Sequence, residues 1–225
     1  MNHKGILAYA SFYYLGFFLI RTVAHPFKIG CPIIGELIVE GCDAVLDQLL
    51  RIRLWQHNIL IYEDIDMFDK VYSKYCKHQL NTSNHVVLLL IFNEDEETVL
   101  QNLSDEGVDV EKRRSDGSLL IEDSVLEFFG SGTDMLEYLS ILQQYAIDIG
   151  KEGLTVILDI AGLYLLGSED DLLRFESSIG PSSKKYLANA SLLCCYHIAL
   201  SGKISKESRD RITAQHQKTF YVLDK

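Results

Sequence analysis

The chain has 225 residues, a formal net charge of −11 and a hydrophobic share of 48%. This length fits one domain with an additional segment, and the hydrophobic share, with only 3 prolines, predicts a packed core rather than a disordered chain. The negative charge excludes a general binder of duplex DNA, because such a protein needs a basic face.

The first 35 residues differ from the rest, since they contain Lys4, Arg21 and Lys28 and no acidic residue. As a helix, the apolar residues 5–20 would span roughly 24 Å, less than a bilayer core of about 30 Å. Three interpretations stay open: a packing helix or a translation start placed too early, a membrane anchor, and a cleaved signal. We expect an N-terminal segment over 1–54, with an amphipathic helix within 36–55.

From Trp55 onward, apolar runs typical of strands alternate with helical periodicity. Several runs, such as residues 86–92, are apolar without alternation, which is typical of a strand covered on both faces. We predict one α/β domain over 55–225, with three layers: a mainly parallel sheet and helices on both of its faces. The predicted strands are 58–62, 85–92, 118–121, 154–160, 191–196 and 219–223. The predicted helices are 64–79, 95–106, 133–149, 169–177 and 205–217.

Local patterns indicate where helices begin. The residues 168–171, Ser-Glu-Asp-Asp, predict a helix start, because a serine cap and acidic residues suit the positive end of a helix. Asn93 and Glu96 have the spacing of a capping box. The residues 111–117 are rich in charge and end in glycine, and we interpret them as a turn.

The first predicted strand, residues 58–62, is followed by Glu-Asp-Ile-Asp at 63–66. A nucleotide-binding relative would have a glycine-rich loop there, ending in Lys and Ser or Thr. Without small residues the backbone amides cannot surround a phosphate, and the carboxylates would repel it. No such glycine-rich motif occurs elsewhere in the sequence, so we predict that the phosphate cradle is missing.

In an open α/β sheet, ligands bind beyond the carboxyl ends of the strands. The residues expected there are Tyr62, Glu63, Asn93, Glu94, Asp159, Tyr196 and His197. Asp159 ends an apolar strand, as does the aspartate that holds water on Mg²⁺ in phosphate-binding hydrolases. Many α/β strands end in such a residue as a cap or turn, which is the preferred interpretation here. No histidine or serine pattern specifies a metalloprotease or a hydrolase.

The five cysteines, an odd number, contain no C-x-x-C pair, which argues against a disulfide framework or a structural zinc site. Cys194 and Cys195 are adjacent in a predicted strand, so their side chains point to opposite faces. We interpret them as packing residues in a reducing cytoplasm.

Several motifs follow one another in order along the chain. They are a His and a strand ending in Tyr at 57–63, the segments 107–110 and 117–121, the strand at 153–156, Phe-Glu at 175–176, Leu-Cys-Cys-Tyr at 193–196, and a late His at 216. This order resembles the DcmR-type sensory domain, called MEDS (methanogen/methylotroph sensory), over about three quarters of the chain. Departures include Gln217, where the family has Pro, and Thr155, where it often has Arg.

The resemblance implies a KaiC- or RecA-like core that has lost its phosphate loop and senses small molecules, such as hydrocarbon derivatives. We therefore predict a non-enzymatic sensory module that binds a small molecule and acts on a signalling partner protein. We expect no cofactor, metal, catalytic residue or direct nucleic-acid contact, and a cytoplasmic location, with membrane contact through residues 5–20 left open. The candidate ligand-binding residues are His57, Tyr62, Glu63, Asp159, Glu176, Tyr196 and His216.

Two alternatives remain. A degenerate KaiC- or RecA-like ATPase would bind Mg-ATP and place Asp159 near the metal. A structural or assembly module would use the core as a scaffold and residues 1–35 as its contact.

Overall fold

The computed structural model describes residues 42–91, 94–122, 135–160 and 168–223. All of them belong to a compact unit that extends from Leu37 to Lys225. Helix α2 (Cys42–Leu49) is part of this unit, because Val45 and Leu49 are buried in its core. The unit therefore begins earlier than the expected boundary at 54/55. Residues 5–20, the expected membrane contact, lie outside the described residues.

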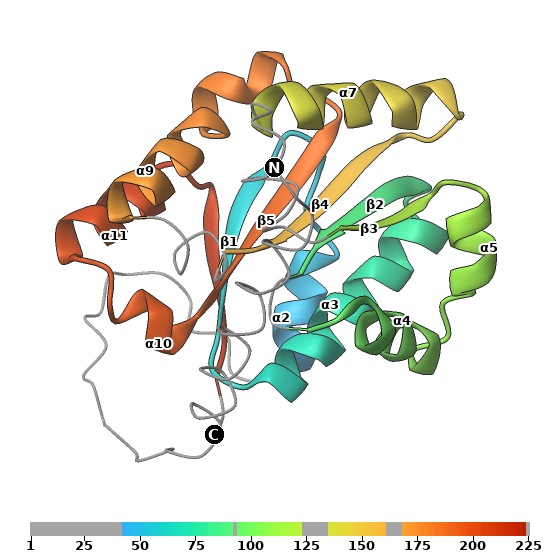
Figure 1. Cartoon of the computed structure of the whole chain (residues 1–225), viewed down its shortest axis with the longest axis horizontal. Helices are drawn as coiled ribbons and strands as arrows, with labels where there is room; N and C mark the ends of the chain where they lie inside the picture. Colours follow the sequence, from blue (N-terminus) through green and yellow to red (C-terminus); the bar gives the residue numbers. More distant parts are fainter. Residues whose placement is uncertain (1–41, 92–93, 123–134, 161–167, 224–225) are drawn as a thin grey trace, which may run out of the picture. The chain divides into compact units, whose positions relative to one another are not determined.

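The described residues form a six-stranded sheet in which all neighbouring strands are parallel. Its strand order is β3-β2-β4-β5-β1-β6, so the first strand of the chain lies between the last two (Figure 1). The strands are β1 (His57–Tyr62), β2 (His85–Leu90), β3 (Leu119–Glu122), β4 (Gly153–Asp159), β5 (Ala190–His197) and β6 (Lys218–Val222). Each of the six predicted strands is confirmed, and so is the parallel sheet.

Helices cover both faces of the sheet, which gives three layers (Figure 1). On one face lie α2, α3 (Ile65–Asn81), α4 (Glu96–Asp105) and α5 (Val110–Ser115); on the other lie α7 (Met135–Asp148), α9 (Glu169–Ser178) and α11 (Lys206–Ala214). Short helices, η2 (Pro181–Lys185) and α10 (Ile198–Ser201), flank β5 in the sequence.

Side-chain alternation along the strands separates two hydrophobic cores. Cys194 and Tyr196 of β5 lie in the core under α7, α9 and α11, whereas Leu193 and Cys195 lie in the core under α2, α3 and α4. Both sets are buried, which explains why these strands are apolar without alternation. Adjacent residues of one strand therefore face different chemical surroundings.

Two local predictions were wrong. The residues 111–117 are mostly helical rather than a turn, because α5 begins at Val110 and Asp109 accepts a hydrogen bond from the Lys112 amide. The N-cap of α4 is Asp95, whose Oδ1 lies 2.8 Å from the Thr98 amide, instead of the expected Asn93. In both cases an aspartate satisfies a free amide of the first turn, which helix N-termini require.

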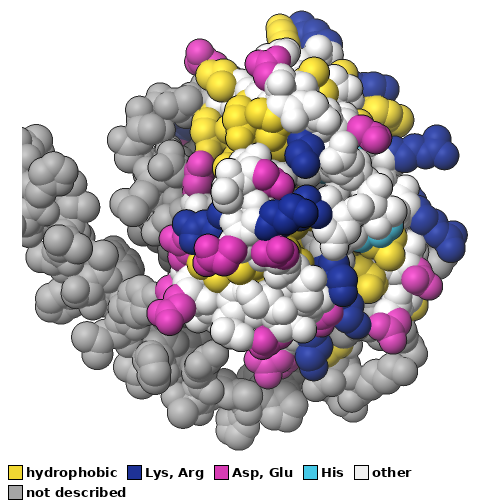
Figure 2. Space-filling view, turned by 90° about the vertical axis from the view of Figure 1, so that its right-hand side faces the viewer, with side chains coloured by type: hydrophobic (Ala, Val, Ile, Leu, Met, Phe, Trp, Pro, Cys, Tyr) yellow, Lys and Arg dark blue, Asp and Glu magenta, His cyan; other side chains and the backbone are white. Residues whose placement is uncertain are grey.

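Charged side chains of both signs occur on the surface of the described residues. Acidic and basic side chains are interspersed over the face in Figure 2, and no continuous basic area is seen among the described residues of that face. None of the helices in the described part of the chain combines the length and the apolar content that a bilayer span requires.

Candidate functional site

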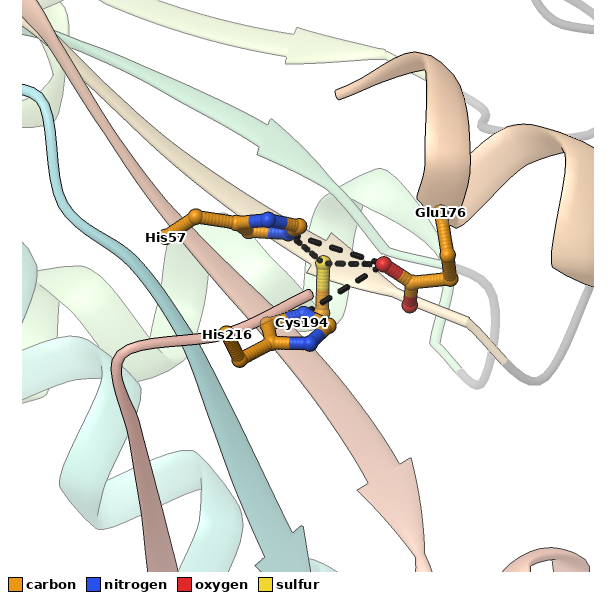
Figure 3. Close-up of side chains that lie close together, drawn as sticks. All are labelled: His57, Glu176, Cys194 and His216. Atoms are coloured by element: carbon orange, nitrogen blue, oxygen red, sulfur yellow. Dashed lines mark hydrogen bonds and ion pairs between the residues drawn. The ribbon is translucent and has the colours of Figure 1, made fainter. Parts of the chain in front are cut away.

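Four polar side chains, from elements far apart in the sequence, meet under α9. They are His57, Glu176, Cys194 and His216, and they point toward one another (Figure 3). His57 begins β1, Glu176 lies on α9, Cys194 lies within β5, and His216 lies between α11 and β6. We call these four residues the His-Glu-Cys cluster. It lies nearer the amino ends of β1 and β6 than the carboxyl edge at which a pocket was expected.

Strand periodicity and register place the two sheet residues side by side. His57 pairs with Leu192 in the parallel register of β1 and β5, so Cys194 lies two residues further along the neighbouring strand, on the same face as Leu192. Ile59 and Cys194 belong to the same core, so His57 shares this face with Ile59. The backbone thus fixes the separation of the imidazole and the thiol.

The other two members reach the cluster from the helices above the sheet. On α9, Leu172 and Phe175 are buried in the core, and Glu176 lies on the same face at helical spacing. His216 follows α11, and its Nδ1 lies 2.7 Å from the carbonyl oxygen of Ile212. That carbonyl accepts a hydrogen bond from the protonated Nδ1, and this contact directs Nε2 into the cluster.

The distances within the cluster are short. The Nε2 atom of His57 lies 3.1 Å from the sulfur of Cys194 and 3.6 Å from Oε2 of Glu176. Nε2 of His216 lies 3.3 Å from the same carboxylate oxygen, and the Cys194 sulfur lies 3.8 Å from it. The Tyr196 hydroxyl donates a hydrogen bond to the other carboxylate oxygen, Oε1. A cation or a shared proton fits such a set of converging atoms.

Burial and neighbouring charges set the protonation of the cluster. Burial, followed by the adjacent His216, lowers the pKa of His57 to about 3, against the opposing effect of Glu176. Burial by itself would raise the pKa of the Glu176 carboxyl. The histidines and the Tyr196 hydroxyl outweigh burial, so this pKa lies below the usual glutamate value. At neutral pH the site therefore contains a carboxylate and a neutral His57 imidazole.

The Cys194 thiol is a poor nucleophile in this setting. Burial, together with the neighbouring Glu176 carboxylate, raises its pKa well above the usual value. A reactive cysteine needs a thiolate and access to substrate, and Cys194 is fully buried. The geometry therefore favours binding over covalent catalysis.

A pocket of about 220 Å³ opens beside the cluster. His57 forms part of its wall, so the pocket and the cluster share one side chain. Most of the remaining lining is apolar or aromatic, and a few groups are polar. The lining residues other than His57 are Trp55, Ile179, Gly180, Pro181, Ser183, Lys184, Leu187, Ala190, Leu192 and Gln217. Lys184 places its ammonium 3.8 Å from the centre of the Trp55 ring, a cation–π contact at the rim.

The candidate residues from the sequence fall into two groups. His57, Glu176, Tyr196 and His216 lie together in or beside the cluster. Tyr62 lies on the opposite face, where its ring stacks on Phe68 with centroids 4.3 Å apart. Glu63 is exposed after β1, and Asp159 is buried at the end of β4, beside Cys195 in the sheet register. The structure does not bring this second group into the cluster.

The carboxyl edge after β1 is short and acidic. Only two residues separate β1 from α3, and Asp64 caps α3 by accepting a hydrogen bond from the Met67 amide at 2.9 Å. A side-chain carboxylate thus occupies the helix end where a phosphate would bind. This agrees with the absence of a phosphate cradle that the sequence predicted.

A pair of carboxyl groups, Asp69 on α3 and Glu94 after β2, interacts near this acidic turn. Tyr72 and Asn102 hydrogen-bond to Glu94, at 3.0 and 3.2 Å. Burial, and next the neighbouring Glu94, raise the pKa of Asp69 to about 8. Burial also raises the pKa of Glu94, although its hydrogen bonds with Tyr72, Asp69 and Asn102 oppose this. The pair therefore holds a proton at neutral pH. Two carboxyl groups offer no positive charge or backbone amide to a phosphate.

Two residues of the site were missed in the sequence. Cys194 was interpreted as a packing residue, yet it lies two residues before Tyr196 and therefore on the same face of the strand. That spacing could have added Cys194 to the candidate site with Tyr196. Trp55 was treated only as a boundary, but it lines the pocket and has a φ of 63°. A positive φ is costly for a bulky residue, and no sequence pattern indicated it.

No protein-family model and no curated protein matches the chain. Solved structures do match its fold. One is an uncharacterized protein from Pyrococcus horikoshii, solved in complex with an unknown peptide. It matches with a TM-score of 0.56 and 18% sequence identity, and the match covers 77% of this chain and 81% of that one. Another is a KaiC-like protein from Pyrococcus horikoshii OT3, with a TM-score of 0.54, 11% identity and coverage of 76% and 73%. These similarities show the fold alone, which is a RecA-like α/β fold.

Proposed function

We infer that this protein is a non-enzymatic sensory or regulatory module, which binds a small molecule in the pocket beside His57 and transmits the change to a partner protein. One observation is the main support: His57 lines the pocket and also contacts the buried carboxylate of Glu176. A molecule that moves the imidazole therefore disturbs the contacts between α9 and the sheet. The order of motifs that resembles MEDS sensory domains agrees with this proposal.

The size and lining of the pocket define the kind of ligand. A volume of about 220 Å³ is smaller than the usual range for drug-sized ligands, so a molecule with few heavy atoms fits. Leu187, Leu192 and Pro181 offer apolar contacts, whereas Lys184 and His57 offer polar ones. We propose a short hydrocarbon chain with one polar or anionic group.

Hydrogen bonds connect the pocket to the sheet. The backbone amide of Gln217 donates to the His57 carbonyl at 2.8 Å, and the Gln217 side chain accepts from the His57 amide. Gln217 also lines the pocket and immediately precedes β6. Ligand binding would therefore shift the starts of β1 and β6 together, and with them the end of α11.

A screen of short-chain alcohols, amines and carboxylates tests the proposal. Trp55 is the one tryptophan of the sequence and lines the pocket, so a ligand should change its fluorescence and also raise the Tm. The expected stabilisation is about 2.7 kcal/mol at a hundredfold excess over the Kd.

The matched variants are Trp55→Ala and Tyr186→Ala, since both side chains are exposed and only Trp55 lines the pocket. The first should lose the shift in Tm and the second should keep it. Ligands that stabilise both variants equally, with unchanged tryptophan fluorescence in the wild type, would exclude this pocket. Absence of any stabilising compound from the whole series would reject the proposed ligand class.

A further inference from the structure

Each member of the His-Glu-Cys cluster offers one atom that binds metal ions: Nε2 of His57 and His216, Sγ of Cys194, and Oε2 of Glu176. These atoms all lie within 4.8 Å of one another. They come from β1, α9, β5 and the segment before β6, so the spacing rules for sequence motifs do not detect them. Figure 3 shows that the four side chains converge from different directions.

The separations fit a tetrahedral ion. Zinc binds nitrogen and oxygen at about 2.0–2.2 Å and sulfur at about 2.3 Å, which gives ligand–ligand separations of roughly 3.3–3.6 Å. The four measured separations are 3.1 Å for His57–Cys194, 3.3 Å for His216–Glu176, 3.6 Å for His57–Glu176 and 3.8 Å for Cys194–Glu176. Each of these four lies within about half an ångström of the tetrahedral values. The other two of the six separations, from His216 to His57 and to Cys194, are bounded by 4.8 Å, so His216 would have to move toward the ion.

The surrounding hydrogen bonds orient the ligand atoms. The carbonyl of Ile212 lies 2.7 Å from Nδ1 of His216, which leaves Nε2 with its lone pair toward the cluster. The Tyr196 hydroxyl binds Oε1 of Glu176, which leaves Oε2 for an ion. Such outer contacts are typical of histidine and carboxylate ligands of metals.

The donor set selects the class of ion. Two imidazoles, one thiolate and one carboxylate suit Zn²⁺, whereas Ca²⁺ and Mg²⁺ require six or more ligands that are mostly oxygen. The carboxylate and the thiolate together have two negative charges, which a divalent ion neutralises. Four protein ligands complete a tetrahedron and leave no position for substrate, as in a structural or sensing site.

We propose that His57, Glu176, Cys194 and His216 bind one Zn²⁺ ion, which fastens α9 to β1 and β5. On binding, the ion replaces the thiol proton of Cys194, which passes to solvent, and no electron is transferred. The pocket provides a route for entry, because His57 lies on its wall. The site goes beyond the small-molecule ligand proposed above and does not depend on it.

The experiment uses the full chain, freed of metal with a chelator, refolded and desalted. Zn²⁺ or Co²⁺ is added alone, without any small molecule, and retained metal is measured by mass spectrometry. We expect about one ion per chain and a higher Tm. With Co²⁺ we expect the absorption bands of tetrahedral coordination and a thiolate charge-transfer band.

Cys194→Ser and Cys195→Ser form the decisive pair, because the two residues are adjacent in β5, equally buried and on opposite faces. Cys194→Ser should lose the charge-transfer band, and Cys195→Ser should keep it. His57→Gln and His85→Gln form a second pair, since each residue is buried at the start of a parallel strand. Tyr196→Phe should keep the band and weaken metal affinity about 10- to 100-fold.

A folded wild type that retains no Zn²⁺ or Co²⁺ would overturn the metal site and show that hydrogen bonds alone close the cluster. Equal binding by Cys194→Ser and Cys195→Ser would overturn it as well. If circular dichroism shows that Cys194→Ser fails to fold, the histidine variants test the site instead. His57→Gln should then lose metal binding and His85→Gln should keep it, and equal binding by both would overturn the site. Trp55→Ala should bind metal normally, so loss of the small-molecule response and loss of metal binding are separate results.

Discussion

At the scale of single residues, burial decides which acidic groups are charged. Glu176 is fully buried yet faces two imidazoles and a hydroxyl, and its pKa lies below the usual value despite burial. Asp69 is less buried but faces the carboxyl of Glu94, and its pKa rises to about 8, first through burial and then through that neighbour. The same kind of group is thus ionised in one place and protonated in another because of its immediate neighbours.

The raised pKa of Asp69 predicts a particular dependence of stability on pH. The folded state keeps a proton up to about pH 8 that the unfolded state releases near its ordinary pKa of 3.8. The folded state therefore binds more protons between these values, and the free energy of unfolding falls as the pH rises through this range. Asp69→Asn should flatten this decline and be more stable than the wild type at about pH 8.

Urea unfolding at about pH 5 and pH 8 measures the effect. We expect a difference of about 1 kcal/mol, because a half-exposed carboxyl is partly screened by water. The exposed Asp210→Asn makes the same side-chain substitution away from the pair and should keep the wild-type dependence. A parallel decline in wild type and Asp69→Asn would show that this pair does not hold the proton.

At the scale of elements, the first turns of α9 and α11 are held together by hydrogen bonds. Glu169, in the first turn of α9, accepts hydrogen bonds from the backbone amide and hydroxyl of Ser205, the N-cap of α11. Glu176 lies on α9 and His216 follows α11, so this contact joins the two elements that bring them to the sheet. The position of α9 therefore matters for the whole cluster.

The capping box of α9 gives a test of this element. The Ser168 hydroxyl accepts from the Asp171 amide, and the Asp171 carboxylate accepts from the Ser168 amide. Ser168→Ala should lower the free energy of unfolding by about 1 kcal/mol, because the amides of the first turn lose an acceptor. The control Ser177→Ala, exposed on the same helix, should change it by less than about 0.5 kcal/mol. Equal effects in chemical unfolding would mean that the cap contributes nothing specific.

At the scale of the whole molecule, a RecA-like fold is present in which the described turn after β1 is acidic and lacks the glycine-rich loop that binds triphosphate. The turn after β1 has two residues, its helix is capped by Asp64, and the pair of Asp69 and Glu94 lies nearby. Phosphate groups would meet carboxyl groups where hydrolases offer backbone amides. The fold by itself therefore gives no reason to assign ATP hydrolysis.

We expect Mg-ATP to give no heat in calorimetry and no change in Tm, because the acidic turn offers no amide cradle for its phosphates. Asp159→Asn titrated with Mg-ATP should likewise give no heat and no change in Tm. Magnesium-dependent binding in the wild type that disappears in Asp159→Asn would favour the degenerate ATPase instead. Circular dichroism and a cooperative thermal transition of the same sample check that the protein is folded.

The sequence alone determined the elements and their class, because continuous apolar runs and helix caps depend on neighbours in the chain. It identified the six strands, the parallel sheet and the missing phosphate cradle, but missed α5, which only an aspartate cap distinguishes from a turn. Among the site residues it named His57, Glu176, Tyr196 and His216, without their grouping. Tertiary structure decided that grouping, because strand register and helix packing bring His57 together with residues more than a hundred positions further along the chain. It also added Cys194 to them and placed Tyr62 on the other face of the sheet.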